Sequence, residues 1–305
     1  MRGDLKMAFP PVLHFLKTFF QKESAGGFLL VLMVAAALVW VNSPLAPFYN
    51  AMRAIPVHLT LGTFQIHKPL YLWVNDGLMA LFFLLVALEI KREITEGELS
   101  HLKKASLPVA AALGGIVVPA LFYMAFNPPG TPTFHGWAIP CATDIAFALA
   151  VLNLLGKRVP VALKIFLLSL AIIDDLAAIL IIALFYTKNL NMTYLFVAFV
   201  LCFILGGLNK ARVRRLFPYL AVGLVMWAAL LKSGLHATLA GVVVAFFIPL
   251  KGFPRRLSPL PYLEKKLHGF VSYIIMPVFA LFNAGLKMNV LSPDLIQSAV
   301  AMGIT

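Results

Sequence analysis

Long apolar runs recur along almost the whole chain, and they restrict its fold more than any other feature. A bilayer core about 30 Å thick needs about 20 apolar residues per helix. Nine runs approach this length, separated by short polar or Pro/Gly-rich breaks: 26–41, 70–88, 107–126, 137–155, 161–185, 194–208, 217–231, 235–250 and 270–286. The sequence therefore predicts an all-α polytopic membrane protein, with a single transmembrane domain over residues 1–305.

The composition excludes several other classes of protein. Of the 305 residues, 61% are hydrophobic and only 12% are charged, far from the averages of soluble domains. The two cysteines, Cys141 and Cys202, both fall inside apolar runs, which excludes a disulfide-rich secreted module. The sequence has no phosphate-binding loop and no cysteine-rich metal spacing. We therefore expect neither an enzyme nor a cofactor.

The excess of positive charge indicates membrane topology. Of the 25 Lys and Arg residues, 19 lie in alternate connections on one side. The opposite side carries five, and Lys164 lies in the first turn of the run 161–185. The positive-inside rule then predicts a multi-pass protein with a cytoplasmic N-terminus and membrane lipid as its surroundings. The net charge of +13 is explained without nucleic acid, which we do not expect as a partner.

The first external connection predicts a small β-hairpin. Apolar and polar residues alternate on both sides of Gly62-Thr63 over residues 57–67, as in paired strands. An irregular loop is the alternative. Because an isolated hairpin is marginally stable in water, pairing with a second copy across a dimer axis is one candidate for its partner.

Two adjacent carboxylates lie in the middle of an apolar run. Asp174 and Asp175 are flanked by Leu-Ala-Ile-Ile and Leu-Ala-Ala-Ile. One Asp at the centre of a membrane helix costs about 3 kcal/mol on insertion scales, so such residues normally face a partner or a water-filled pathway. Neighbours in a helix point about 100° apart. The two carboxylates can therefore border one cavity and play different roles.

Competition between a proton and a cation is the chemistry that this pair suggests. A carboxyl group surrounded by hydrocarbon and by another carboxylate holds its proton until a cation replaces it. Oxygen ligands favour a hard ion such as Na⁺ or Li⁺. We therefore predict a Na⁺ site at Asp175 and Asp174.

A third buried carboxylate, Asp144, lies in a run that also contains Pro140 and Thr143. Proline removes one helical hydrogen bond, while Thr143 and Asp144 can satisfy backbone groups freed by unwinding. We interpret this run as a broken helix at mid-membrane, with a merely kinked helix as the alternative. For Asp76, near the outer end of its run, an interfacial and a functional role both remain open.

Six motifs then resemble those of the NhaA-type sodium/proton antiporter family, and the likeness runs from the first span to the last residue. They are WVNDGLMA (73–80), LEIKRE (88–93), ATDIAFA (142–148), AIIDD (171–175), KSGLHATLAG (232–241) and FNAG (282–285). The resemblance implies inverted repeats with discontinuous helices at the midplane. It also implies a pH-regulated, electrogenic exchanger in a bacterial inner membrane, which uses proton influx to expel Na⁺ or Li⁺ for sodium and pH homeostasis.

The resemblance also implies roles for individual residues. Asp175 would be the main cation ligand and proton carrier and Asp174 its partner, while Thr143 and Asp144 would belong to the broken helix. The hairpin would serve a homodimer. Residues that match positions linked to pH regulation are Glu89, Arg92, Glu93, His236 and Glu264. The alternative for these five is that they are topology signals, solvated ion pairs or ordinary polar contacts.

The end of the sequence departs from the family pattern. An eleven-residue apolar run, 295–305, starts from the external side and is long enough for roughly half a membrane. We expect nine spans plus a partial tenth, without the second inverted repeat, its broken helix and an intramembrane lysine that the family pattern contains. A truncated, non-transporting fragment of an antiporter is therefore the alternative function.

Two other membrane functions fit the sequence less well. An intramembrane aspartyl protease would also use paired aspartates, but its Tyr-Asp and Gly-x-Gly-Asp motifs on separate helices do not occur here. A cation channel would need a continuous polar lining, whereas this chain has one compact acidic cluster.

Overall fold

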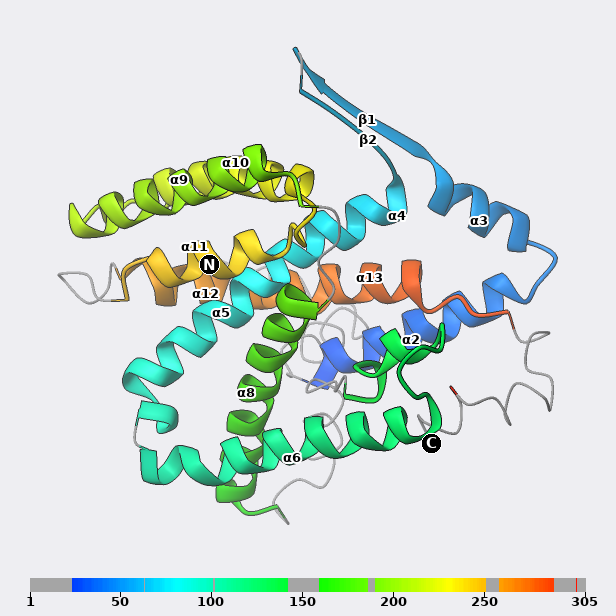
Figure 1. Ribbon diagram of the computed structural model, residues 1–305, viewed down its shortest axis with the longest axis horizontal. Helices are drawn as coiled ribbons and strands as arrows, with labels where there is room; N and C mark the ends of the chain where they lie inside the picture. Colours follow the sequence, from blue (N-terminus) through cyan, green and yellow to red (C-terminus); the bar gives the residue numbers. More distant parts are fainter. Residues whose placement is uncertain are drawn as a thin grey trace, which may run out of the picture.

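The computed structural model describes residues 24–62, 64–100, 102–141, 159–185, 190–250, 258–287 and 300. Helices account for most of them, and one two-stranded sheet is present (Figure 1). The elements are α2 (Ser24–Val41), α3 (Ala46–Ala54), β1 (Pro56–Leu61), β2 (Phe64–Pro69), α4 (Leu70–Trp73), η1 (Val74–Leu78), α5 (Met79–Glu96), η2 (Glu98–Ser100), α6 (Leu102–Phe126), η3 (Phe134–Gly136), η4 (Ile139–Cys141), α8 (Val161–Phe185), α9 (Met192–Lys210), α10 (Leu216–Ser233), α11 (Leu239–Phe247), α12 (Pro259–Phe270), η7 (Val271–Ile275) and α13 (Met276–Asn283).

Several helices have the length and composition of membrane spans. Among the described residues, five are long and apolar enough to cross a bilayer, and α2 with α3, bent by 114°, adds a sixth if the pair is one span. The prediction of a helical, polytopic membrane protein is confirmed. Helix α11 has only nine residues, fewer than the predicted run 235–250. The count of nine crossings and a partial tenth stays a prediction.

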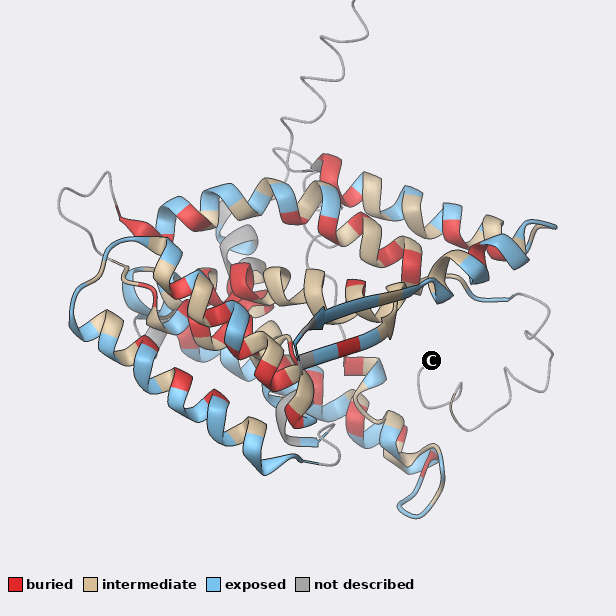
Figure 2. Ribbon diagram, turned by 90° about the horizontal axis from the view of Figure 1, so that it is seen from above, coloured by how far each residue is buried: buried red, intermediate tan, exposed pale blue. Residues whose placement is uncertain are grey.

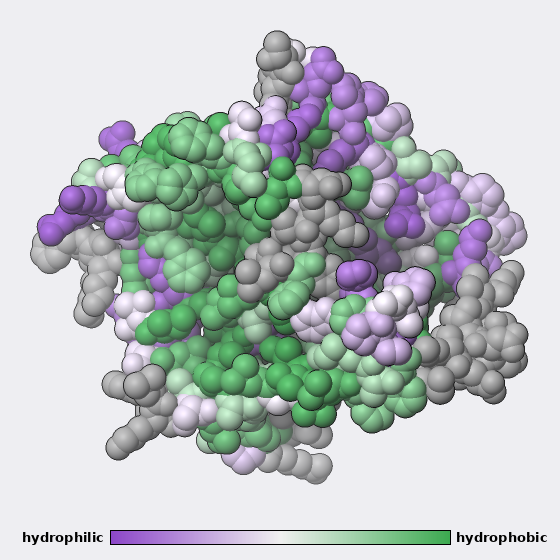
Figure 3. All heavy atoms as spheres, viewed as in Figure 1, coloured by the Kyte–Doolittle hydropathy of each residue, from purple (hydrophilic) through white to green (hydrophobic). Residues whose placement is uncertain are grey.

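Apolar side chains cover the outside of the helices. Val118 of α6 is 64% exposed, Phe203 of α9 66% and Phe217 of α10 80%. Figure 3 shows a broad hydrophobic surface over the helices, with hydrophilic side chains gathered around the projecting hairpin. Large exposed apolar surfaces are costly in water and favourable in lipid, so these faces are suited to contact with acyl chains.

Helix α5 is the central element of the core. It crosses α11, and both contribute to the largest buried cluster together with residues of α8, α9, α10 and α12. The crossing is close because position 241 is glycine: a Cβ there would overlap the Ala80 carbonyl oxygen and lie 2.9 Å from the Leu84 amide nitrogen. Figure 2 shows buried residues concentrated where the helices cross.

Helix α8 runs between α5 and α6 and contacts both (Figure 1). Its interior is a continuous series of Leu, Ile and Ala interrupted by Ser169 and the two aspartates. Ser169 is buried. One face of α8 therefore packs against α5 and another against α6. The candidate site lies on these two faces.

Within the described residues, two short π-helical turns interrupt longer helices. The turn η1 joins α4 to α5, and η7 joins α12 to α13. Asn75 of η1 and Asn283 at the end of α13 form a reciprocal amide pair: Asn75 Nδ2 donates to Asn283 Oδ1 at 3.1 Å, and Asn283 Nδ2 donates to Asn75 Oδ1 at 2.8 Å. Such turns often occur at functional sites. Here the amide pair connects two segments that are far apart in the sequence.

The predicted β-hairpin is confirmed. Strands β1 and β2 pair antiparallel from Pro56 opposite Pro69 to Leu61 opposite Phe64, so the hairpin extends one residue before and two residues beyond the predicted range. Gly62 begins the turn with φ of 60°, a backbone conformation that favours glycine. Figure 1 shows the hairpin projecting from the helices.

Candidate functional site

The aspartate pair lies near the middle of α8, as the sequence predicts. Asp174 and Asp175 are the fourteenth and fifteenth of its 25 residues, and both are half-buried. Helical geometry turns their side chains about 100° apart. The two carboxyl groups therefore have different neighbours.

The face of α8 that carries Asp174 is directed toward α6 and η4. Ala177 and Ile181, which follow Asp174 by one and two turns, pack against a buried cluster that includes Ile116 and Cys141. The Cys141 thiol donates a hydrogen bond to the Ile116 carbonyl oxygen at 3.2 Å, and the charge of Asp174 acts on this thiol. Asp174 thus lies beside the described part of the run that we interpreted as a broken helix.

The face that carries Asp175 is directed toward α5. Ile172 and Ile179, one turn before and one turn after Asp175, belong to buried clusters that contain α5 side chains. The charge of Asp175 acts on the carboxyl group of Glu89 in α5. The first residue of the predicted pH-regulatory set therefore responds to Asp175, although the charges of Glu264 and Arg92 act on it more strongly.

Four of the five predicted regulatory residues lie together. Arg92 of α5 forms an ion pair with Glu264 of α12, with 3.1 Å between Nη2 and Oε1. Charges of Glu264 and Arg92 act on Glu89, and Glu93 and His268 act on Glu264. We call Glu89, Arg92, Glu93 and Glu264 the charged cluster. It joins α5 to α12 and reaches Asp175 through Glu89.

The remaining predicted residues are not all part of this assembly. His236 is exposed in the turn between α10 and α11, at the opposite end of α11 from the charged cluster. The structure does not bring it to the other four. Thr143 and Asp144 lie outside the described residues. The roles predicted for all of these side chains stay predictions.

A lysine that we did not single out stabilises the end of α11 beside the charged cluster. Lys91 Nζ donates to the carbonyl oxygens of Phe246 and Ile248 at 2.7 and 2.6 Å. Asn209 Nδ2 donates to the carbonyl oxygen of Phe247 at 2.6 Å. A cation at a helix C-terminus offsets the partial negative charge of the unpaired carbonyl groups. Sequence alone offered no signal for the Lys91 contacts, because Lys91 is more than 150 residues from Phe246 and Ile248.

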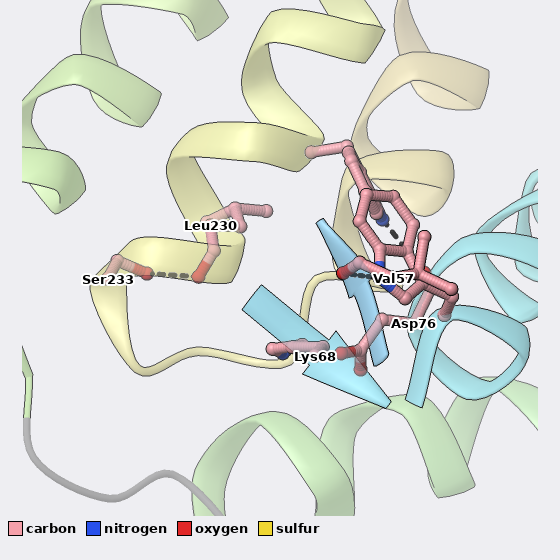
Figure 4. A network of polar contacts seen from close by, with 7 residues as sticks. Val57, Lys68, Asp76, Leu230 and Ser233 are labelled. Carbon is pink, nitrogen blue, oxygen red and sulfur yellow. Dashed lines mark hydrogen bonds and ion pairs between the residues drawn. The ribbon is translucent and has the colours of Figure 1, made fainter. Parts of the chain in front are cut away.

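Asp76 forms an ion pair at the base of the hairpin. Its Oδ2 lies 2.6 Å from Lys68 Nζ, and its backbone carbonyl accepts a hydrogen bond from Trp227 Nε1 at 2.8 Å. Trp73 Nε1 donates to the carbonyl oxygen of Val57 (Figure 4). These contacts give Asp76 a structural role, fixing η1 to the hairpin and to α10.

These features define a polytopic helical membrane protein with ionisable groups inside its helical bundle. The chain belongs to the Na⁺/H⁺ antiporter 1 family, which it matches over residues 17–305. This confirms the resemblance seen in the six motifs.

Similar proteins in bacteria carry antiporter names. The chain is 54% identical over 289 residues to the Na⁺/H⁺ antiporter NhaA of Shewanella frigidimarina, covering 95% of this chain and 73% of the relative. It is 55% identical over 289 residues to NhaA 2 of Shewanella denitrificans, with the same coverage. It is 51% identical over 295 residues to NhaA 1 of Pseudomonas putida, covering 97% of this chain and 74% of the relative.

Proposed function

We propose that this chain exchanges Na⁺ or Li⁺ for protons across a bacterial inner membrane, with its N-terminus in the cytoplasm, and so serves sodium and pH homeostasis. The observation that carries the proposal is the aspartate pair at the centre of α8, in a chain of the Na⁺/H⁺ antiporter 1 family. A charged group at mid-membrane is costly, and such groups normally line ion or proton pathways. The pair is therefore the proposed transport site.

The exchange follows from competition for the same oxygen atoms. Asp175 binds either a proton or the cation, and Asp174 contributes a second carboxylate beside it. Thr143 and Asp144 complete the ion path in a broken helix. Proton binding from one side and cation binding from the other then give antiport, because one site cannot hold both.

The charged cluster is the proposed pH-responsive part. Glu89 supports this role because the charges of Glu264, Arg92 and, most weakly, Asp175 act on it. A change of protonation in the cluster alters the field at Asp175 and therefore the competition between proton and cation. We propose His236 as a separate contributor at the other end of α11.

The arrangement of the whole protein is also part of the proposal. An NhaA-like fold would place broken helices of inverted repeats at the midplane, and the hairpin would join two copies in a homodimer. The alternative function is a fragment that does not transport by itself. The same experiment tests it by comparing two chain lengths, because the alignments cover about three quarters of each relative.

The test is Na⁺-dependent proton efflux from everted vesicles of an antiporter-deficient bacterial host, followed with a pH-sensitive dye. Four chains are compared: the 305-residue chain, a chain extended to the relatives' length, and each with Asp175→Asn. We expect exchange that saturates with Na⁺ and is lost with Asp175→Asn. Exchange in the extended chain alone would overturn the proposal for the 305-residue chain by itself and support the alternative of a non-transporting fragment.

Glu96→Gln is the matched control, because it removes one exposed carboxylate at the end of α5 and should leave exchange unchanged. Membrane levels of every variant are measured by immunoblot. The proposal fails if neither length exchanges, or if Asp175→Asn retains the parent rate. Non-saturating Na⁺ flux without proton movement would instead indicate a channel.

A further inference from the structure

Two histidines face each other across the hairpin, away from the ion-exchange site. His58 of β1 is the direct register partner of His67 of β2. The Nδ1 atoms of the two rings lie 2.5 Å apart, and the ring centroids 4.6 Å. Directly opposite residues of an antiparallel pair share one face of the sheet. The rigid backbone register therefore holds two imidazoles together at an exposed surface.

A third side chain orients one of these rings. Gln65 Oε1 lies 3.1 Å from His67 Nε2, on the same face of β2, two residues before His67. Since an amide oxygen can only accept, His67 carries its proton on Nε2. Its Nδ1 then presents a lone pair toward His58, whose Nδ1–H donates to it. This pattern, in which the second ring nitrogen donates to an oxygen acceptor, is the one that orients metal-ligating histidines.

We propose that the hairpin is a two-histidine chelate for a borderline divalent transition cation, with Zn²⁺ and Cu²⁺ as the best-matched ions. Both Nδ1 atoms would be ligands, and water or further donors would fill the other positions. Metal–nitrogen bonds of about 2.0–2.1 Å in tetrahedral geometry require about 3.3 Å between the two nitrogens. The two nitrogens, 2.5 Å apart here, would therefore move apart by about 0.8 Å on binding, through rotation of the two side chains.

Metal binding at the two histidines requires no reactant other than the cation. The His58 proton leaves Nδ1, and the ring takes the other neutral tautomer, with its proton on Nε2. The cation replaces this proton between the two rings. His67 keeps the Nε2 proton that it shares with Gln65. Binding would tie β1 to β2 at the two exposed histidines, so it should stabilise the pairing of the strands.

The imidazole ligands determine which cations the hairpin site would bind. Neutral nitrogen donors prefer Cu²⁺ and Zn²⁺ to the hard ions Na⁺, Mg²⁺ and Ca²⁺. This site is therefore distinct in ligand type from the carboxylate pair in α8, and it does not rest on the proposed exchange function. Acid should weaken binding, because a protonated imidazole cannot ligate.

The test is calorimetric titration of the purified, tag-free chain in detergent with Zn²⁺ and Cu²⁺, with Mg²⁺ as a hard-ion comparison. We expect saturable binding in the order Cu²⁺ > Zn²⁺, no measurable Mg²⁺ binding, and weaker binding as the pH falls. His58→Gln and His67→Gln should each weaken Cu²⁺ binding more than tenfold. Gln65→Ala should weaken it about tenfold, as expected for loss of an orienting partner.

His135→Gln is the matched control, because it removes another exposed histidine and leaves the hairpin pair intact. Electron paramagnetic resonance of the Cu²⁺ form gives a second readout, with nitrogen hyperfine structure expected in the parent and in His135→Gln but lost in the double variant His58→Gln/His67→Gln. Unchanged affinity in the double variant, or equal loss in His135→Gln, would overturn the proposal. So would the absence of saturable binding to the parent chain.

Discussion

Asp174 and Asp175 are neighbours in the chain but have different surroundings. One lies on the face of α8 directed to α6 and η4, where its charge acts on Cys141. The other lies on the face directed to α5, where its charge acts on Glu89. The 100° rotation between successive residues therefore directs Asp174 toward the described part of the predicted broken helix and Asp175 toward the helix that carries the charged cluster.

Glu89→Gln should change the pH dependence of exchange without abolishing it. Removing a negative charge near Asp175 weakens the hold of that carboxylate on its proton, so Na⁺ competes at lower pH. We expect the rate profile to move toward acid by a small amount, because Asp175 is the weakest of the three charges that act on Glu89. The measurement is the initial exchange rate in everted vesicles between pH 6 and 9. A profile that coincides with that of Glu96→Gln would contradict the coupling.

Short π-helical turns determine how the long helices meet. The turn η1 places Asn75 beside Asn283, and it also directs the Asp76 carbonyl to Trp227. Both contacts join segments more than 150 residues apart, and they lie where a regular helix would have continued. The π-helical turn η1 therefore interrupts a regular helix and places its polar groups in contact with other helices.

The Asn75–Asn283 pair should show measurable coupling. In a double-mutant cycle with Asn75→Ala and Asn283→Ala, we expect a coupling free energy of about 0.6 kcal/mol, with about 1.7 kcal/mol as the upper end for such bonds between membrane helices. The free energy of unfolding is measured by steric trapping in lipid bicelles. Strictly additive losses would mean that the two amides do not stabilise the protein through each other.

The whole molecule is organised around the crossing of α5 with α11. Gly241 lets the two backbones approach, and Lys91 of α5 caps the far end of α11. The charged cluster continues from the same region of α5 to α12. The packing of α11 therefore depends on the helix that also carries Glu89, which links the stability of the bundle to the position of the proposed regulatory residues.

Gly241→Ala should destabilise the protein, because the new methyl group would overlap backbone atoms that cannot move independently. We expect a loss of about 1–3 kcal/mol in the free energy of unfolding. Gly207→Ala is the control, since apart from the nearby backbone of its own helix no atom lies within 4 Å of its added Cβ, and alanine favours the helix by up to about 1 kcal/mol. Thermal unfolding in detergent, followed by tryptophan fluorescence, compares them. Equal stability of the two variants would contradict the close crossing.

The sequence by itself determined the class of the protein. Runs of apolar residues, the charge asymmetry of the connections and the alternation around Gly62 each reflect local physics, namely the cost of exposing peptide groups to lipid and the two-residue period of a strand. The sequence also identified Asp174 and Asp175 as candidate functional residues, because a charged side chain inside hydrocarbon is costly whatever the position of its helix in the bundle.

Only the tertiary structure decided which of these groups meet. Nothing in the sequence indicated that Lys91 caps α11, that Asp76 pairs with Lys68, or that His236 lies apart from Arg92 and Glu264. Such contacts depend on the crossing of helices and on hydrogen bonds between segments distant along the chain. Local periodicity indicates which face of a helix is buried, but it does not indicate which helix packs against that face. Close packing at positions such as Gly241 selects the neighbouring helix.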